Sequence, residues 1–146
     1  MKATRPFPER ARARRRALQA LYQWQIGGGP MRRIIEQFNE EQDMAIADGA
    51  YFSDVLLGVE QHLEQIDAAI APCADRRIDE IDAIERATLR IATWELQHRL
   101  DIPYRVVINE AIDLAKDFGA EGGHSYVNAV LDRVARNTRQ AESAAH

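Results

Sequence analysis

The stretch IDAIERATLRIATWELQHRL, residues 81–100, decides the fold. Its apolar residues recur at helical spacing along two ridges: Ile84, Ala87, Ile91 and Trp94 on one, and Leu89, Ala92, Leu96 and Leu100 on the other. Asp82 and Glu85 form an aspartate variant of the capping box, which predicts that the helix begins there. We expect a central helix that is buried over most of its circumference, with a polar side made of Arg86, Arg90, Thr93 and Gln97.

Apolar periodicity predicts further helices on both sides of this stretch. The expected helices run from the arginines near residue 12 to Gly27, from Met31 to Phe38, from about residue 49 to Ile70, and from Pro103 to a Gly119 cap. Ser125 is the expected N-cap of a last helix, which would expose Arg133, Arg136 and Arg139.

No segment alternates with period two for long enough to predict a strand. We therefore expect an all-α fold of about seven helices in two small helical bundles packed together. Residues 1–146 would form one domain, with an N-terminal subdomain at 1–72, a C-terminal subdomain at 73–140 and a frayed tail at 141–146. Pro6 and Pro8 predict an extended N-terminus, and residues 73–82 a short helical turn.

Composition indicates an ordinary soluble globular protein. Apolar residues make up 46% of the chain and charged residues 29%, so neither a disordered nor a fibrous class fits. Cys73 is the only cysteine and can form no internal disulfide, and no apolar stretch is long enough for a signal sequence or a membrane span. We expect a cytoplasmic protein without a membrane partner.

The charge is unevenly distributed. Residues 1–16 carry seven basic side chains and one acidic side chain, a net charge of +6, whereas the remaining residues sum to −10. A basic segment on an acidic body suggests a polyanion at one place and a cationic protein at another. A solvated, functionless terminus is the alternative reading of the same arginines.

The sequence lacks the motifs of an enzyme or a metal site. Cys73 has no second cysteine, the histidines stand apart, and Gly27 to Gly29 are not followed by the residues of a phosphate-binding loop. Glu121 and His124 match half of a di-iron motif, but two glycines between them predict a loop and no second copy exists. We expect no catalytic activity, no metal and no cofactor.

Aromatic residues follow the arginines into the first helix. Guanidinium groups neutralise phosphates and aromatic rings stack on bases, a combination typical of proteins that bind single-stranded nucleic acid. Trp24 shares a ridge with Ala17 and Ala20 and is expected in the core, whereas Tyr22 flanks the apolar stripe and could keep its hydroxyl in water.

Several stretches resemble the NusB family of bacterial transcription antitermination factors. They are ARRRALQALYQWQ, EQFNEEQDMAIADGAYFSDVLLGV, IDAIERATLRIATWEL and DIPYRVVINEAIDLAKDFGAEGGHSYVNAVLDRVAR, within residues 10–136. The resemblance implies a two-bundle, non-catalytic protein that binds single-stranded boxA RNA of ribosomal RNA leaders together with NusE, a small-subunit ribosomal protein. Other antitermination factors and RNA polymerase would join through that complex.

The resemblance also implies the site residues. For RNA they are Arg12, Arg14, Arg15, Arg16, Tyr22, Phe118, Gly122, Gly123 and Tyr126. For NusE they are Arg76, Asp79, Glu80 and Glu85, although Asp79 to Glu85 could equally cap a helix and face water. Gly122 stands where the family often has an acidic or amide residue, and Trp94 where it usually has tyrosine.

Three alternatives remain open at the level of sequence. A NusB-like domain also precedes some ribosomal RNA methyltransferases, so the chain could be an accessory RNA-binding domain for a modification or ribosome-assembly partner. Helices with arginines also occur in helix-turn-helix proteins that bind duplex DNA. Two copies could pair as a homodimer and cover the arginines.

Overall fold

The computed structural model describes residues 7–41, 44–140 and 142. Seven α-helices and two short 3-10 helices are found there: α1 (Pro8–Gly27), α2 (Met31–Glu41), α3 (Gly49–Gln61), α4 (Leu63–Ile70), η1 (Ala71–Cys73), η2 (Ile78–Glu80), α5 (Ala83–His98), α6 (Tyr104–Phe118) and α7 (Gly123–Thr138). Within those residues no strand forms, so the all-α prediction is confirmed.

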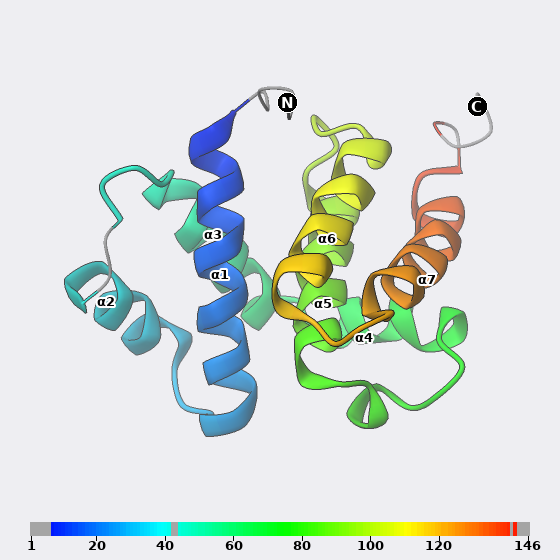
Figure 1. The fold of residues 1–146 in the computed structure, drawn as a ribbon, viewed down its shortest axis with the longest axis horizontal. Coiled ribbons are helices and arrows are strands. Elements are labelled where there is room, and N and C mark those ends of the chain that lie inside the picture. Colours follow the sequence, from blue (N-terminus) through cyan, green and yellow to red (C-terminus); the bar gives the residue numbers. More distant parts are fainter. Residues whose placement is uncertain (1–6, 42–43, 141, 143–146) are drawn as a thin grey trace.

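The helices form two groups that meet at α5 (Figure 1). In the first group α1 packs against α2 and α3, and in the second α6 and α7 pack against each other and against α5. Helix α5 also contacts α1, α3 and α4, so it is the shared central helix that its two apolar ridges predict. The subdomain boundary at residue 72 stays a prediction, and the frayed tail predicted at 141–146 lies, except for Glu142, outside the described residues.

Helix α5 is buried over most of its surface, as expected. Asp82 caps it by accepting a hydrogen bond of 3.0 Å from the backbone N–H of Ile84. At the other end the helix stops at His98, and Leu100, expected on an apolar ridge, lies beyond the helix with 70% of its surface exposed. The indole of Trp94 is buried against Gly58, where a Cβ atom would collide with it.

The prediction of one helix from about residue 49 to Ile70 is wrong. The chain breaks at His62, which ends α3 and precedes α4, and the His62 ring stacks on His98 with centroids 4.2 Å apart. Apolar residues keep helical spacing across the break, so periodicity alone does not reveal it.

Three predictions about the ends of helices are also wrong. Pro8 is the first residue of α1, where its missing N–H costs nothing, rather than part of an extended segment; Pro6 lies outside the described residues. Gly122, with φ of 81°, replaces Ser125 as the residue before α7. Arg139 is buried and not exposed, because its guanidinium donates to the carbonyl oxygens of Glu95, Leu96, Arg99 and Ile102.

Candidate nucleic-acid interface

One side of α1 faces away from the core and carries the arginines. Ala13, Ala17, Leu18 and Leu21 are fully buried, which turns the opposite side of the helix outward. Arg12 and Arg15 are exposed there, and Arg16 is half-buried. The residues at the same helical spacing further along are Gln19, Tyr22, Gln23 and Ile26.

The outward arginines meet the end of α6. The Arg15 guanidinium lies 4.9 Å from the centroid of the Phe118 ring and pairs with Asp117. Arg12 Nη1 donates to the backbone oxygen of Ile46 at 3.3 Å. These side chains surround a hollow of about 310 Å³. Its lining residues form the surface that is called the arginine face below: Arg12, Arg15, Arg16, Gln19, Ile46, Ala47 and Phe118.

Arg14 is not part of the arginine face, which corrects its assignment to the RNA surface. Only 4% of its surface is exposed, and its Nε and Nη2 atoms lie 2.9 and 2.8 Å from Glu95 Oε2. The hydroxyl of Tyr51 donates to the same carboxylate oxygen. Burial by itself would lower the pKa of Arg14, but the charge and hydrogen bond of Glu95 outweigh it and the pKa is raised. Arg14 therefore neutralises a buried carboxylate.

The loop between α6 and α7, which follows Phe118 in the chain, forms a second pocket. It is called the loop pocket below and is lined by Arg76, Ile81, Asp82, Glu85, Ala120, Glu121, Gly122, Gly123 and Tyr126. The Arg76 guanidinium covers the Tyr126 ring at 4.5 Å from its centroid, and burial raises the pKa of Tyr126. The loop residues predicted for RNA and two residues predicted for NusE thus share one pocket.

Glu85, predicted either to contact NusE or only to cap its own helix, lies beneath this loop. It is 3% exposed, and its Oε1 accepts a hydrogen bond of 3.2 Å from the backbone N–H of Ala120. A Cβ atom at Gly123 would collide with that same oxygen, so the glycine makes room for the carboxyl. Burial, with the nearby Asp82 carboxyl adding to it, raises the pKa of Glu85, while the hydrogen bond between them lowers that of Asp82.

The other three residues predicted for NusE are exposed. Arg77 Nε contacts Glu80 Oε1 at 2.7 Å and Asp79 Oδ1 at 3.4 Å, and Arg76 pairs with Asp75 at 2.8 Å. These alternating charges surround η2 and project from the second bundle. Their arrangement suits recognition by a charged protein surface.

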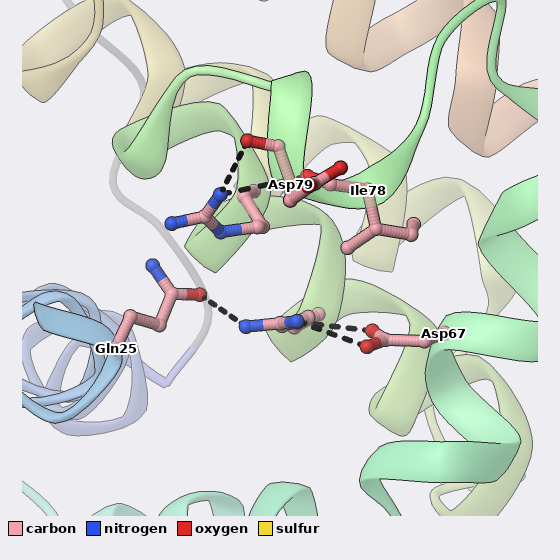
Figure 2. Close-up of a pocket in the computed structure, with 6 residues that line it drawn as sticks. Gln25, Asp67, Ile78 and Asp79 are labelled. Carbon is pink, nitrogen blue, oxygen red and sulfur yellow. Dashed lines mark hydrogen bonds and ion pairs between the residues drawn. The ribbon is translucent and has the colours of Figure 1, made fainter. Parts of the chain in front are cut away.

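A polar pocket of about 450 Å³ lies between α1, α4, α5 and η2 (Figure 2). Arg90 of α5 donates to Asp67 at 2.9 and 3.0 Å and to Gln25 of α1 at 2.9 Å. Arg86 reaches the backbone oxygens of Ile78 and Asp79 at 3.5 and 3.4 Å, as the dashed lines in Figure 2 show in part. These contacts hold η2 and α1 against α5.

The described part of the chain contains neither a candidate metal site nor a candidate membrane span. No group of three or more histidine, cysteine, aspartate and glutamate side chains there could hold a metal ion. No described helix is both long and apolar enough to cross a membrane.

Some residues of the surface carried no sequence signal. Asp117 pairs with Arg15 from 102 positions away and Ile46 accepts from Arg12 from 34 positions away, so no local pattern predicts either contact. Gln19 could have been predicted as part of the arginine face, because it follows Arg15 by four positions and Arg16 by three and so lies on the same side of the helix.

The fold and surface define the class as a small all-helical protein with a cationic, aromatic-edged face on its first helix. A model of the NusB family matches residues 11–136. The chain therefore belongs to the NusB family.

Relatives and solved structures agree with this assignment. The transcription antitermination protein NusB of Stenotrophomonas maltophilia (strain K279a) is 59% identical over 134 residues, which covers 92% of this chain and 84% of that protein. T. maritima NusB superposes with a TM-score of 0.77 at 30% identity and 93% coverage of both chains. A crystal structure of the antitermination factors NusB and NusE in complex with dsRNA gives a TM-score of 0.75 at 25% identity, covering 90% of this chain and 99% of that one.

Proposed function

We propose that this protein is an RNA-binding transcription antitermination factor that holds single-stranded boxA RNA on its arginine face. The convergence of Arg12, Arg15 and Arg16 with the Phe118 ring on one face carries the proposal. Guanidinium groups bind phosphates and stack on bases, and an aromatic ring adds a sequence-tolerant platform. In this role the protein supports processive transcription of ribosomal RNA in the cytoplasm.

The loop pocket provides the second part of the RNA surface. Gly122 and Gly123 allow a phosphate to approach the backbone closely, and Tyr126 offers a ring edge beside Arg76. Phe118 connects the loop pocket to the arginine face, because it precedes the loop and lies under Arg15. An RNA strand would cross from α1 to the start of α7.

NusE would bind the charged surface around η2. Asp79 and Glu80 are exposed there, and residues 17–146 sum to −10, which suits a basic ribosomal protein. A solved relative contains NusB together with NusE and RNA, which supports the same pairing here. Other antitermination factors and RNA polymerase would be reached through this assembly.

The proposal is tested by fluorescence anisotropy on a labelled boxA-type single strand at several salt concentrations. The Arg15→Ala/Arg16→Ala variant should bind more weakly and with a shallower salt dependence, because it releases fewer counterions. Arg136→Ala is the matched control, since Arg136 is also an exposed helical arginine paired with an aspartate, on α7. Equal losses in both variants would show that the arginine face is not the binding surface.

The partner surface is tested in the same assay with NusE added. Asp79→Ala/Glu80→Ala should remove the gain in affinity that NusE brings and leave binding to RNA alone unchanged. Duplex RNA and duplex DNA of the same sequence are the competitors. If duplex DNA binds as tightly as the single strand, a DNA-binding function replaces the proposed one.

A further inference from the structure

An acidic residue at the end of α6 contacts the arginine face. Asp117 lies in the last turn of α6, and its Oδ2 atom pairs with Nη1 of Arg15. Arg12, by contrast, donates to the backbone oxygen of Ile46, which carries no net charge. None of the described residues that line the arginine face carries a carboxylate. Asp117 therefore brings a negative charge from outside the lining to one particular arginine.

The position of Asp117 is unfavourable for the helix that carries it. The last carbonyl groups of a helix lack partners within the helix and give its C-terminal end a partial negative charge, which disfavours a carboxylate there. Both side chains of the Arg15–Asp117 pair are nearly half exposed, and exposed ion pairs contribute little to stability. The stability of the fold therefore does not account for an acid at this place.

The Asp117 carboxylate occupies the place on Arg15 that a phosphate of RNA would take. Carboxylates and phosphates accept hydrogen bonds from the same N–H groups of a guanidinium, and bidentate contacts are the strongest. Asp117 contacts Arg15 through Nη1, so a phosphate that binds two N–H groups gains more and can displace it. The Phe118 ring, with its centroid 4.9 Å from the guanidinium, supports Arg15 with either anion.

We infer that Asp117 is an internal competitor of RNA, which sets the affinity of the arginine face by occupying Arg15 until a phosphate displaces it. The inference rests on the proposed function, because only an RNA strand held on the arginine face has to displace Asp117. It follows that the protein binds RNA more weakly than its exposed arginines would allow. Because the pair is exposed and weak, the competition is readily reversed.

The test measures the anisotropy of a labelled boxA-type single strand with the Asp117→Asn variant across a salt series. Asparagine keeps the size of the side chain and removes its charge, so binding should tighten by about two- to fivefold, the range of an exposed ion pair. The gain should shrink as the salt concentration rises, since salt screens the pair that the variant lacks.

Asp132→Asn is the matched control. Asp132 is also an exposed helical aspartate paired with an arginine, Arg136, at 2.9 Å on α7. Its substitution removes the same charge from the protein but frees no residue of the arginine face. RNA affinity should therefore stay at the native value. An equal gain in both variants would show that net charge alone is responsible and would overturn the inference.

A double-mutant cycle shows whether Asp117 acts through Arg15. In the Arg15→Ala background, Asp117→Asn should bring no gain, because no guanidinium is left for it to release. A gain that persists in full without Arg15 would mean that Asp117 only repels RNA, and competition would be overturned. Weaker binding by Asp117→Asn would overturn it as well, because Asp117 would then hold Arg15 in place for RNA.

The same series separates the inference from the proposed function. If Arg15→Ala/Arg16→Ala weakens binding while Asp117→Asn has the native affinity, there is no competition and the arginine face still binds RNA. If neither the two arginines nor Asp117 affect binding, the proposed function fails and the inference fails with it.

A strand with one uncharged linkage gives an independent readout. A methylphosphonate linkage replaces one phosphate oxygen with a methyl group and removes the charge of that phosphate. Moved along the strand, it should abolish the gain of Asp117→Asn at one position, because the phosphate that takes the place of the carboxylate is then missing. A gain of the same size at every position would contradict the inference.

Discussion

The outer side of α1 and the network around Glu95 both contain an arginine paired with a carboxylate, but the first pair is exposed and the second is buried. Arg15 has a side chain that is 46% exposed and pairs with the equally exposed Asp117, whereas the side chain of Arg14, its neighbour, is 5% exposed and pairs with a carboxylate that is 2% exposed. Exposed ion pairs contribute little to stability, but a buried charge that loses its partner costs several kcal/mol. The surroundings of a guanidinium therefore decide whether it stabilises the fold or stays accessible at the surface.

The strongest test of this contrast is Arg14→Ala. It would leave the buried Glu95 and Tyr51 without their cation, and we expect the free energy of unfolding to fall by about 3–5 kcal/mol. Urea denaturation measures this loss. Arg15→Ala should change stability by no more than about 0.5 kcal/mol. A similar loss in both variants would contradict the division between the two regions.

Arg139 extends the comparison to the second bundle. Its buried guanidinium donates to four backbone oxygens at the end of α5 and beyond, at 2.8 to 3.2 Å. Because lysine keeps the charge but has no planar fork, Arg139→Lys should cost about 2 kcal/mol and increase amide hydrogen exchange in the last turn of α5. Arg136→Lys, at an exposed site on the same helix, is the control. Unchanged exchange would mean that charge alone caps α5.

The sequence predicts the helices well, because each buries a stripe at a spacing near 3.6 residues. The sequence also indicates that Arg14 and Glu85 are buried, although the family resemblance assigns them to binding surfaces. Arg14 shares a face with Leu18 and Leu21, and Glu85 shares one with Leu89 and Leu96, so both lie on buried stripes. Their partners could not be predicted, because Glu95 is 81 positions from Arg14 and the N–H of Ala120 is 35 positions from Glu85.

The candidate interface was only partly predictable for the same reason. Arg12, Arg15, Arg16 and Tyr22 share one helix side, which helical spacing alone indicates. The contact of Phe118 with Arg15 depends on how α1 packs against α6, and that of Arg76 with Tyr126 on how the segment before α5 packs against α7. No local pattern encodes that packing.

A third prediction concerns what the exposed arginines do for RNA. Log affinity falls as log salt rises, and the steepness of this fall depends on how many phosphates the protein neutralises. For each phosphate of a single strand that a variant no longer neutralises, the slope should become less negative by about 0.7. Arg12→Ala, Arg15→Ala and Arg16→Ala should each approach this change without altering the urea midpoint. Arg14→Ala, measured where it is folded, should keep the native slope. A reduced slope in Arg14→Ala would place its guanidinium on the RNA and break the comparison.

The smallest effect is expected from Glu85, the buried acid of the loop pocket. Burial raises its pKa above the usual 4.5, with Asp82 adding to the shift, so between pH 4.5 and the raised value the folded protein binds more protons than the unfolded chain. Stability should therefore fall as the pH rises through that window and then level off. Asp82 has the opposite sign, because its pKa is lowered and its contribution is lost only as the pH falls below its usual 3.8.

Urea midpoints measured from pH 4 to pH 8 test this window, with Glu85→Gln and Glu121→Gln compared with the native protein. Glutamine cannot ionise but can still accept from the N–H of Ala120, so Glu85→Gln should remove the fall in stability while leaving the loop in place. Glu121 is an exposed acid of the same loop, and its variant should keep the native profile. If Glu85→Gln also keeps that profile, the Glu85 carboxyl is ionised and hydrated in the folded protein. It would then face the loop pocket as an acceptor, in the same environment as the exposed carboxylates around η2.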